Sequence, residues 1–446
     1  MRPNSASERG RFFSALEEEF RITKEEARDF IPEFHQEMQA GLARGKSSLK
    51  MLPAFIGRPK GTEKGNYLAL DLGGTNCRIL EVELDGKGKA RIKTVKRWVV
   101  PRKIMKGTGT ALFDFLADCL ASFLKEHPTG RKEKKRLTFT FSFPFFQPSL
   151  NSGTLIRWTK GFTASGVEDR DVVVLLTEAL QRKGVKGLRI TALTNDTVGT
   201  LMARSYSDPA CDMGVIIGTG CNACYPEQGK RIKKYPGPGL KGEMIINMEW
   251  GNFDGLKSNP YDVLLDRDSP NPGRQLLEKM VSGMYLGEIV RLVAREMIAR
   301  HLWPSGPGRL YWEKSYSLSS RDVSLLAEGK EPWKKKKEWD LNTAEREMVG
   351  RIGGIVALRS ARMAASALAA VISWMDPLLE KKHTVAVDGA LFEKYPGYRS
   401  WMSEMLWEIF GDKAKKIRMV LTKDGSGIGA AIVGAVAVTL GSRGRP

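Results

Sequence analysis

Hydrophobic residues near the start of the chain recur with the spacing of an amphipathic helix. The apolar positions between residues 11 and 45 are Phe12, Phe13, Leu16, Phe20, Ala27, Phe30, Ile31, Phe34 and Met38, with many charged residues between them. Residues three and four apart share one face of a helix. The spacing therefore predicts an N-terminal helical segment with one apolar face.

Beyond Tyr67 the pattern becomes an alternation of strands and helices. Strands are predicted at residues 67–70, 78–84, 90–100, 137–143 and 187–193. Helices are predicted at residues 110–126 and 171–183, and a turn at residues 85–88. The stretch 137–143 is the clearest strand, because apolar residues occupy every odd position in it.

The second half of the chain repeats this opening. Strands are predicted at residues 212–218, 223–225, 244–248, 384–387 and 417–421. Helices are predicted within residues 273–301 and 344–375, around 400–410, and from Gly427 onward. Two strand-rich α/β units, each opening with a hairpin, predict two lobes with a cleft between them.

Composition narrows the chemistry available to these lobes. The chain has 446 residues, of which 42% are hydrophobic, so a core of ordinary size can be buried. Its five cysteines are too few and too scattered for a disulfide scaffold. The pair Cys221 and Cys224 lacks the further ligands that zinc needs, and the four histidines lie outside any acidic or glycine-rich cluster. Metal-redox chemistry and histidine-driven nucleophilic catalysis are therefore not expected.

The formal net charge is +20, which favours an anionic partner. Nucleic acid, an acidic membrane surface and a phosphorylated small molecule all fit that charge. The first 20 residues lack the apolar core of a secretory signal. The longest apolar run, about residues 427–440, is shorter than the roughly 20 residues of a membrane span. We therefore expect a cytoplasmic protein without a membrane anchor.

The turn between the first two strands carries the strongest candidate chemistry. Residues 70–78 combine an aspartate at a strand end, two adjacent glycines, two small polar residues and an arginine. Glycines leave backbone N–H groups open to a phosphate oxygen, and the aspartate can orient Mg²⁺ through water. An ordinary hairpin with a Gly-Gly turn is the alternative. The candidate phosphate contacts are Asp71, Gly73, Gly74, Thr75, Asn76 and Arg78.

Further glycine-rich turns follow strands of the second half. Thr219 and Gly220 form a second candidate phosphate loop, which with the first would grip a polyphosphate from both sides. Residues 388–390 and 424–429 suit a nucleotide, but they lack the spacing of a dinucleotide-binding fingerprint. The loose P-loop match at residues 40–47 lacks a preceding strand, so we interpret it as accidental.

A set of polar residues lies at the ends of predicted strands. Amides, carboxylates, hydroxyls and one lysine that converge on a cleft would suit a polyhydroxylated ligand, which needs both donors and acceptors. Taken singly, each is as well explained by a turn or a helix cap. The set contains Ser142, Phe143, Thr159, Lys160, Asn195, Asp196, Asn222, Glu249 and Glu278.

At these residues the chain resembles the hexokinases of eukaryotic type, within the superfamily of sugar kinases, Hsp70 and actin. The resemblance runs from about Met51 to Ala437 and preserves the order of many motifs. The motifs are residues 70–78, 107–115, 139–143, 151–162, 195–200, 218–225, 247–251, 278–288, 387–389 and 424–429. One set of them is similar to a single-unit hexokinase and not to a tandem one.

The resemblance implies ATP-dependent phosphorylation of the 6-hydroxyl of glucose or a related hexose. Asp196 matches the general base and Lys160 the cation beside the transferring phosphoryl group. The sugar contacts implied are Ser142, Phe143, Thr159, Lys160, Asn195, Asp196, Asn222, Glu249 and Glu278. The nucleotide contacts implied are the two phosphate loops with Gly389 and Gly425, and Asp71 would act on Mg²⁺ through water.

The implied fold is α/β, a two-lobed ribonuclease H-like or actin-like ATPase fold with a central cleft. Residues 1–66 would pack on the large lobe, residues 67–195 with 425–446 would form the small lobe, and residues 196–424 the large lobe. Closure of the lobes over the sugar would exclude water as a competing acceptor. A monomer or a homodimer is expected, and no nucleic-acid partner.

Two departures and two alternatives stay open at this point. Ala390 stands where many members carry serine, and Ile428 where some carry lysine, so both bear on nucleotide affinity. A catalytically silent sugar sensor or an actin-like ATPase would use the same fold. A nucleic-acid binder is suggested by charge alone, since the chain has no helix-turn-helix or zinc-finger pattern.

Overall fold

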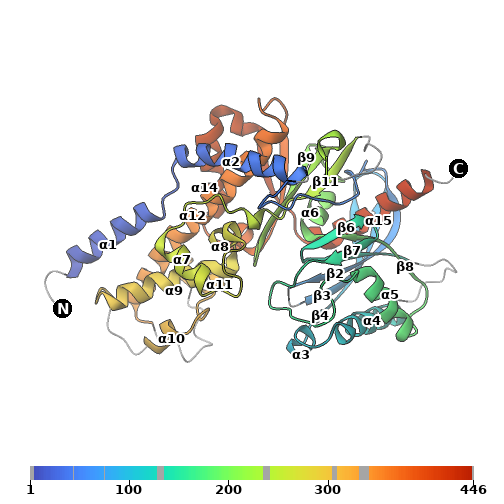
Figure 1. Ribbon diagram of the computed structural model, residues 1–446, viewed down its shortest axis with the longest axis horizontal. Helices are drawn as coiled ribbons and strands as arrows, with labels where there is room; N and C mark the ends of the chain where they lie inside the picture. Colours follow the sequence, from blue (N-terminus) through green and yellow to red (C-terminus); the bar gives the residue numbers. More distant parts are fainter. Residues whose placement is uncertain are drawn as a thin grey trace.

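The two lobes are built on sheets with the same strand order. The computed structural model describes residues 5–43, 45–74, 76–127, 135–234, 242–303, 309–330 and 341–443. In each sheet three consecutive antiparallel strands are followed by two parallel ones, and the large-lobe sheet has the short β1 as a further antiparallel edge strand. This arrangement confirms the predicted repeat. Figure 1 shows the lobes side by side, and they form the predicted two-lobed α/β fold.

The small-lobe sheet has five strands in the order β4-β3-β2-β5-β8. They are β2 (Lys64–Gly73), β3 (Asn76–Asp85), β4 (Ala90–Val99), β5 (Lys135–Phe141) and β8 (Leu188–Thr194). A separate hairpin pairs β6 (Phe145–Ser149) with β7 (Ser152–Leu155). The helices of this lobe are α3 (Arg102–Met105), α4 (Gly109–Glu126) and α5 (Val172–Arg182). Side chains of α4 and α5 cover one face of the sheet and form its core.

The large-lobe sheet has the order β1-β11-β10-β9-β12-β13. Its strands are β1 (Leu52–Pro53), β9 (Cys211–Ile217), β10 (Cys221–Gln228), β11 (Glu243–Asn247), β12 (His383–Asp388) and β13 (Ile417–Leu421). Its helices are α7 (Pro260–Arg267), α8 (Leu276–Val281), α9 (Gly283–Ala299), α10 (Arg309–Glu313), α11 (Ser320–Ala327), α12 (Thr343–Met375), α13 (Ala390–Lys394) and α14 (Tyr398–Phe410). The 33-residue α12 runs through the middle of the helical layer, where most of its side chains are buried.

The helix α12 is also the one helix among the described residues that is long and apolar enough to cross a membrane. In this fold 83% of its apolar window is buried against the rest of the large lobe. The apolar run that the sequence analysis singled out, residues 427–440, lies in the last helix and is shorter.

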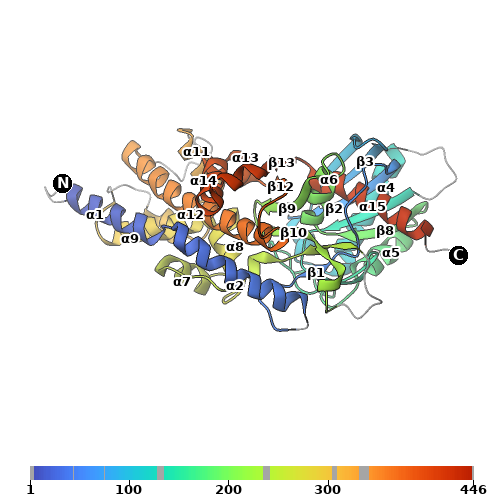
Figure 2. The same ribbon diagram turned by 90° about the horizontal axis from the view of Figure 1, so that it is seen from above.

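The N-terminal segment forms two helices, α1 (Ser5–Glu19) and α2 (Lys24–Leu42), as its apolar spacing predicts. A capping box starts α2, because the Thr23 side chain accepts from Glu26 N–H and the Glu26 carboxylate accepts from Thr23 N–H. Phe34 and Met38 on α2 are completely buried in the same core as the large-lobe helices. Both helices thus lie on the large lobe, along its outer face in Figure 2.

Two helices cross from one lobe to the other between the sheets. Helix α6 (Asp196–Ser205) follows the last small-lobe strand, and α15 (Gly425–Arg443) follows the last large-lobe strand. Helix α6 packs on β9 and against α15, and α15 packs on β2 and β5. At their crossing a Cβ added to Gly429 would lie 1.7 Å from the carbonyl oxygen of Gly199, so the two backbones touch. These helices carry the interlobe core.

The second face of β5 differs from what its alternating sequence suggests. Thr138 and Thr140 are as buried as the phenylalanines between them, because α15 covers the face that they line. Gly434 on α15 makes this contact possible, since a Cβ there would lie 2.5 Å from Thr138 Oγ1. Polar residues on this strand therefore mark a helix contact and not a solvent face.

Candidate active site

A cleft of about 590 Å³ is lined by residues of both lobes. The small lobe contributes the segments that follow β5 and β7, and the large lobe contributes the ends of β9 and β11, the start of β10 and the start of α8. All the residues that the sequence assigned to sugar binding lie in this wall, together with Thr219 and Gly220: Ser142, Phe143, Thr159, Lys160, Asn195, Asp196, Asn222, Glu249 and Glu278. Residues up to 136 positions apart in the chain thus meet at one cavity, from Ser142 to Glu278.

Asp196 is the first residue of α6, and Asn195 caps that helix. The Asn195 Oδ1 accepts from the N–H of Thr197 at 3.0 Å and from its hydroxyl at 2.8 Å. The Asp196 Oδ1 accepts from the same N–H at 2.9 Å. The helix cap therefore fixes the position of the Asp196 carboxylate at the N-terminal end of α6.

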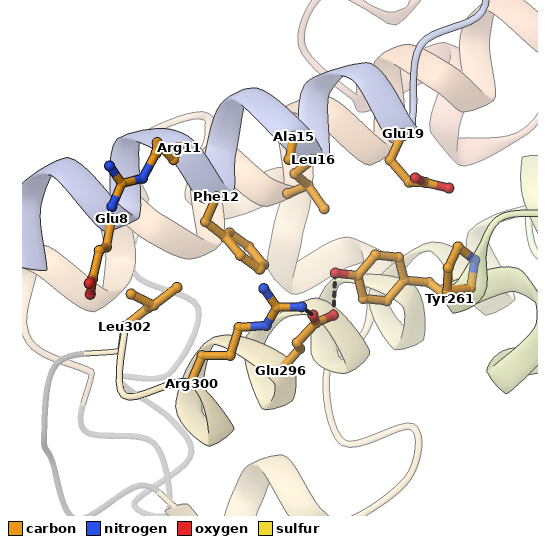
Figure 3. Close-up of a pocket in the computed structure, with 11 residues that line it drawn as sticks. Glu8, Arg11, Phe12, Ala15, Leu16, Glu19, Tyr261, Glu296, Arg300 and Leu302 are labelled. Atoms are coloured by element: carbon orange, nitrogen blue, oxygen red, sulfur yellow. Dashed lines mark hydrogen bonds and ion pairs between the residues drawn. The ribbon is translucent and has the colours of Figure 1, made fainter.

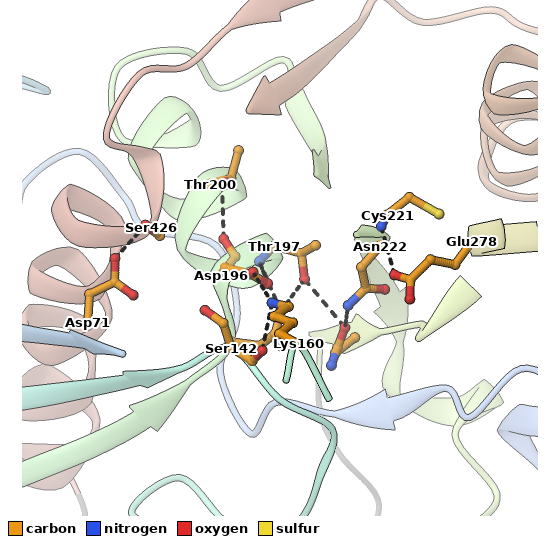
Figure 4. Close-up of polar contacts among 12 residues, drawn as sticks. Asp71, Ser142, Lys160, Asp196, Thr197, Thr200, Cys221, Asn222, Glu278 and Ser426 are labelled. Atoms are coloured by element: carbon orange, nitrogen blue, oxygen red, sulfur yellow. Dashed lines mark hydrogen bonds and ion pairs between the residues drawn. The ribbon is translucent and has the colours of Figure 1, made fainter. Parts of the chain in front are cut away.

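Lys160 is held opposite this carboxylate. Its Nζ donates to the carbonyl oxygen of Ser142 at 2.7 Å and lies 3.6 Å from Asp196 Oδ2. Lys160 has a φ of +55°, a left-handed conformation that a non-glycine residue rarely adopts. Figure 4 shows the ammonium group between Ser142 and Asp196. The pair joins a small-lobe cation to the carboxylate at the start of the crossing helix.

Three polar side chains form a network on the large-lobe wall. Asn222 Nδ2 donates to Asn247 Oδ1 at 2.8 Å and to Glu249 Oε1 at 3.2 Å. Asn247 Nδ2 donates to the same Glu249 oxygen at 3.0 Å. Asn247 is not among the site residues proposed from the sequence, although it ends the strand β11 that precedes Glu249. It holds both neighbours in place at the wall of the cleft.

Glu278 lies at the start of α8, beside the second glycine-rich loop. Its Oε2 accepts from the N–H of Cys221 at 2.9 Å. Burial raises the pKa of Glu278 to about 7, and the carboxylates of Glu249 and Asp196 add to the shift, while this N–H and Lys160 oppose it. A Cβ on Gly220 would lie 2.5 Å from Glu278 Oε2, so the glycine is what admits the carboxylate here.

The first phosphate motif forms a turn that adjoins the cleft. A Cβ on Gly73 would lie 3.2 Å from Ser142 Oγ, which places the turn beside the small-lobe wall. Gly74 has a φ of +54° and open space around it. Thr75 lies outside the described residues. Asn76 and Arg78 start β3, so the motif is a β2–β3 hairpin whose glycines face an open corner.

Arg78 and Asp71 are tied together in this corner. Arg78 Nη2 lies 2.5 Å from Asp71 Oδ2, its Nη1 2.6 Å from Asp424 Oδ1, and its Nη2 2.8 Å from Ser426 Oγ. Ser426 also donates to Asp71 Oδ2 at 3.0 Å (Figure 4). These charges raise the pKa of Arg78, although burial opposes the shift. Ser426 is 355 positions from Asp71, a contact no local sequence pattern could indicate.

The second phosphate loop and the proposed adenosine positions lie at the large-lobe side. The carbonyls of Gly218 and Thr219 accept from the first N–H groups of α9, Gly283 and Met284, which leaves the Thr219 side chain exposed. A Cβ on Gly389 would lie 2.3 Å from the Ile217 carbonyl, so the two loops are in contact. Gly425 packs against Thr200 of α6, and this contact accounts for its lack of a side chain.

Asp388 is a carboxylate that the proposed site omitted. It ends β12 next to Gly389, and burial raises its pKa to about 6, with Asp196 and Asp424 adding to the shift and Gly389 N–H and Arg78 opposing it. The sequence marks residues 388–390 as a nucleotide candidate but indicates no role for the aspartate itself. The two exceptions to the family pattern lie nearby: Ala390 is exposed at the start of α13, and Ile428 packs in the interlobe core.

The residues present fit a hydrated Mg²⁺ bound through one carboxylate and phosphate oxygens. Asp71 Oδ2 is committed to Arg78 and Ser426, while Oδ1 faces the Gly73 turn, where an added Cβ would lie 3.6 Å from it. Mg²⁺ keeps several of its waters in such sites. Among the described residues no three His, Cys, Asp or Glu side chains are grouped as ligands of a metal without such help. The five cysteines are all buried thiols.

Two duplicated lobes, two crossing helices and a polar cleft between them define a two-lobed sugar-kinase fold of the actin-like type. Hexokinase family models match residues 13–206 and 212–436, and the chain belongs to the hexokinase family. The boundary between the two models falls between α6 and β9, where the chain enters the large-lobe sheet.

Named relatives agree with this assignment. The chain is 40% identical to Hexokinase-2 of Rattus norvegicus, with 95% of this chain covered. It spans about half (48%) of that longer protein. It is 36% identical to Hexokinase-1 of Schizosaccharomyces pombe, with 94% of this chain and 90% of that protein covered. The solved hexokinase of Schistosoma mansoni complexed with glucose has a TM-score of 0.86 and 33% identity, with 96% of this chain and 99% of that one covered.

Proposed function

We propose that this chain transfers the γ-phosphoryl group of ATP to the 6-hydroxyl of glucose or a related hexose. The observation that carries the proposal is the pair of Asp196 and Lys160, 3.6 Å apart in a polar cleft that adjoins a glycine turn. Family membership and the similarity to a glucose-complexed hexokinase support the choice of sugar.

The geometry suggests a role for each group around the cleft. Asp196 would accept the proton of the 6-hydroxyl as its oxygen attacks phosphorus, since its carboxylate is fixed by the cap of α6. Lys160 would offset the negative charge that develops on the transferring group. Glu249 and Glu278 would offer carboxylate acceptors to the other hydroxyls, and Asn222 and Asn247 hold Glu249 in place.

The first turn would hold the phosphates through the N–H groups of Gly73 and Gly74, with Arg78 as the fixed cation behind them. Asp71 Oδ1 would orient the water shell of Mg²⁺, which supplies charge neutralisation to the polyphosphate when it is bound. Asp71 itself is kept in place by Arg78 and Ser426. Cytoplasmic location and a monomeric or homodimeric state stay predictions from the sequence.

The test is initial-rate kinetics with glucose and Mg-ATP on three proteins. Wild type should form ADP only when glucose is present. Asp196→Asn should lose about 10²- to 10⁴-fold or more in kcat, the usual contribution of a general base, and still bind glucose by calorimetry. Asp412→Asn, on an exposed side chain, is the matched control and should leave kcat unchanged.

Two results would contradict the proposal. Glucose-independent ATP hydrolysis would favour an actin-like ATPase, and glucose binding without turnover would favour a sugar sensor. Full activity of Asp196→Asn would remove Asp196 as the base while leaving the kinase assignment in place.

A further inference from the structure

An arginine outside the phosphate motif lies in line with it on the small-lobe sheet. Arg97 of β4 pairs directly with Arg78 of β3, and Arg78 pairs directly with Asp71 of β2. Directly opposed residues of antiparallel strands project to the same face of a sheet. Asp71, Arg78 and Arg97 therefore form a row across three strands, on the face where Asp424 and α15 lie.

Two like charges opposed in this way repel each other unless something lies between them. Asp424 does so, with Oδ1 2.6 Å from Arg78 Nη1 and 3.3 Å from Arg97 Nη2. One carboxylate oxygen thus serves two guanidinium groups. The arrangement leaves an excess of positive charge at the β4 side of the row. The phosphates of ATP are negatively charged, so this side of the row would attract them.

The two arginines differ in how much of their binding capacity is used. Arg78 is 20% exposed, and its guanidinium contacts Asp71, Asp424 and Ser426. Arg97 is 60% exposed, and its guanidinium contacts Asp424 at 3.3 Å. A guanidinium has five N–H donors, so Arg97 can bind a phosphate without releasing Asp424.

The strand order also fixes where such a phosphate would be. Ser142, beside the cleft, follows β5, and the row leads away from it through β2 and β3 to β4. Neighbouring strands lie about 4.8 Å apart, so Arg97 is about 10 Å farther from the cleft than Asp71. That distance separates it from the transferred group and matches the phosphates that stay on the nucleotide.

We propose that Arg97 is a nucleotide-binding residue that contacts a non-transferred phosphate of ATP. The inference rests on the proposed ATP-dependent function. A contact with a group that does not change during the reaction is equally strong in the ground state and the transition state. Arg97 therefore acts on the KM for ATP and not on kcat.

The test compares Arg97→Ala with Arg91→Ala by steady-state kinetics and by calorimetry with Mg-ATP. Arg91 is the matched control, because it is exposed on the same strand and opposite Glu83. It lies six residues farther from the glycine turn of Gly73 and Gly74. Arg97→Ala should raise the KM and Kd for ATP about tenfold, as expected for a charge-assisted hydrogen bond at an exposed site, and leave kcat and the KM for glucose within twofold. The effect should shrink as salt is added, because exposed charges are screened. Arg91→Ala should match wild type.

Three outcomes would overturn the inference. They are an unchanged Kd for ATP in Arg97→Ala, an equal change in Arg91→Ala, or a fall in kcat together with thermal stability, which would make Arg97 a structural partner of Asp424. Calorimetry separates this failure from failure of the proposed function. If wild type binds Mg-ATP without phosphorylating glucose, a weaker Kd in Arg97→Ala still supports the contact.

Discussion

Asp196 and Glu278 are carboxylates of one cleft, and their surroundings give them different chemistry. Asp196 faces Lys160 and accepts from a backbone N–H at the N-terminus of α6. Glu278 is desolvated, and its fixed donor is one backbone N–H. A pKa of about 7 means that Glu278 changes charge near neutral pH. The sugar site therefore contains an acceptor that titrates near neutral pH, beside the proposed base.

This difference predicts a pH dependence of sugar binding. The ionised Glu278 accepts hydrogen bonds from sugar hydroxyls more strongly than the protonated acid does. With a pKa of about 7, its ionised fraction rises about tenfold between about pH 6 and about pH 8. The affinity for glucose should rise by up to that factor over the same range, measured by calorimetry in the absence of nucleotide.

Glu278→Gln is the variant that checks the cause. It keeps the shape and an acceptor oxygen but cannot titrate, so its glucose Kd should be weak and nearly independent of pH. A pH dependence equal to that of wild type would assign the titration to another group, with Asp388, which lies outside the cleft lining and has a pKa of about 6, as the next candidate.

The site residues could be named from the sequence to different degrees. Lys160, Asp196 and the glycine turn belong to contiguous motifs, and the fold brings them to one corner. Asn247 and Ser426 lie within motifs of the sequence, but their roles depend on contacts with Asn222 on the neighbouring strand and with Asp71, 355 positions away, which the motifs do not specify. The left-handed φ values of Lys160 and Glu249, +55° and +52°, also depend on tertiary packing, since neither residue favours that region by itself.

At the scale of elements, α6 shows where sequence periodicity fails. Its sequence contains Thr197, Gly199 and Thr200, which are poor helix formers, and no helix was predicted there. The helix forms because Asn195 caps it and because two sheets and α15 pack around it. The strands that were predicted, by contrast, lie within a few residues of their expected positions, because β-branched and aromatic runs mark buried strands directly. The short strands β1, β6 and β7 were not predicted.

The crossing of α6 and α15 makes a strong prediction for Gly429. Gly429→Ala places a methyl group 1.7 Å from the Gly199 carbonyl, and that carbonyl belongs to a helix backbone that cannot move aside alone. The helices must separate, which disturbs the core between the lobes. We expect a loss of at least about 3 kcal/mol in the free energy of unfolding, measured by urea denaturation.

Gly354→Ala is the matched control for this substitution. Gly354 lies within α12, and an added Cβ meets no atom within 4 Å. Alanine is the better helix former by about 1 kcal/mol, so this variant should be as stable as wild type or more so. Equal stability of the two variants would show that the crossing tolerates a side chain after all.

At the scale of the whole molecule, the basic residues behind the net charge of +20 differ in their surroundings. Of the basic runs in the sequence, residues 131–134 and 334–337 lie outside the described residues. The run 230–234 is not simply a solvated surface, because Lys234 Nζ donates to the Lys50 carbonyl at 2.5 Å and burial lowers its pKa to about 8. One of the positive charges, that of Arg97, lies beside the phosphate turn.

The stability of the whole fold should depend on the charge of His383. This buried histidine lies between Asp212, 2.7 Å from its Nδ1, and Asp376, 3.2 Å from its Nε2. Burial opposes the charged form, but the two carboxylates outweigh it and raise the pKa of His383. The two ion pairs of His383 join β9, β12 and the end of α12, so their loss would loosen the large lobe.

The sign follows from linkage. A base whose pKa is raised by folding contributes stability that is complete below its unfolded pKa of about 6.5 and is lost as pH rises through the folded value. The free energy of unfolding should therefore fall above about pH 6.5, measured by urea denaturation at a series of pH values. His383→Gln should have a smaller fall over that range. A parallel pH profile in both proteins would assign the dependence to other groups.

The exchange of α6 and α15 between the lobes has a consequence for how the chain can be divided. A cut between residues 206 and 211 would separate the two family segments, yet the first fragment would lack α15, which covers the second face of its sheet. The second fragment would carry α15 with nothing to cover and would lack α6 from the face of β9. Neither fragment therefore has a complete core by itself. The two would fold only if they were produced together, so that each could supply the helix that the other lacks.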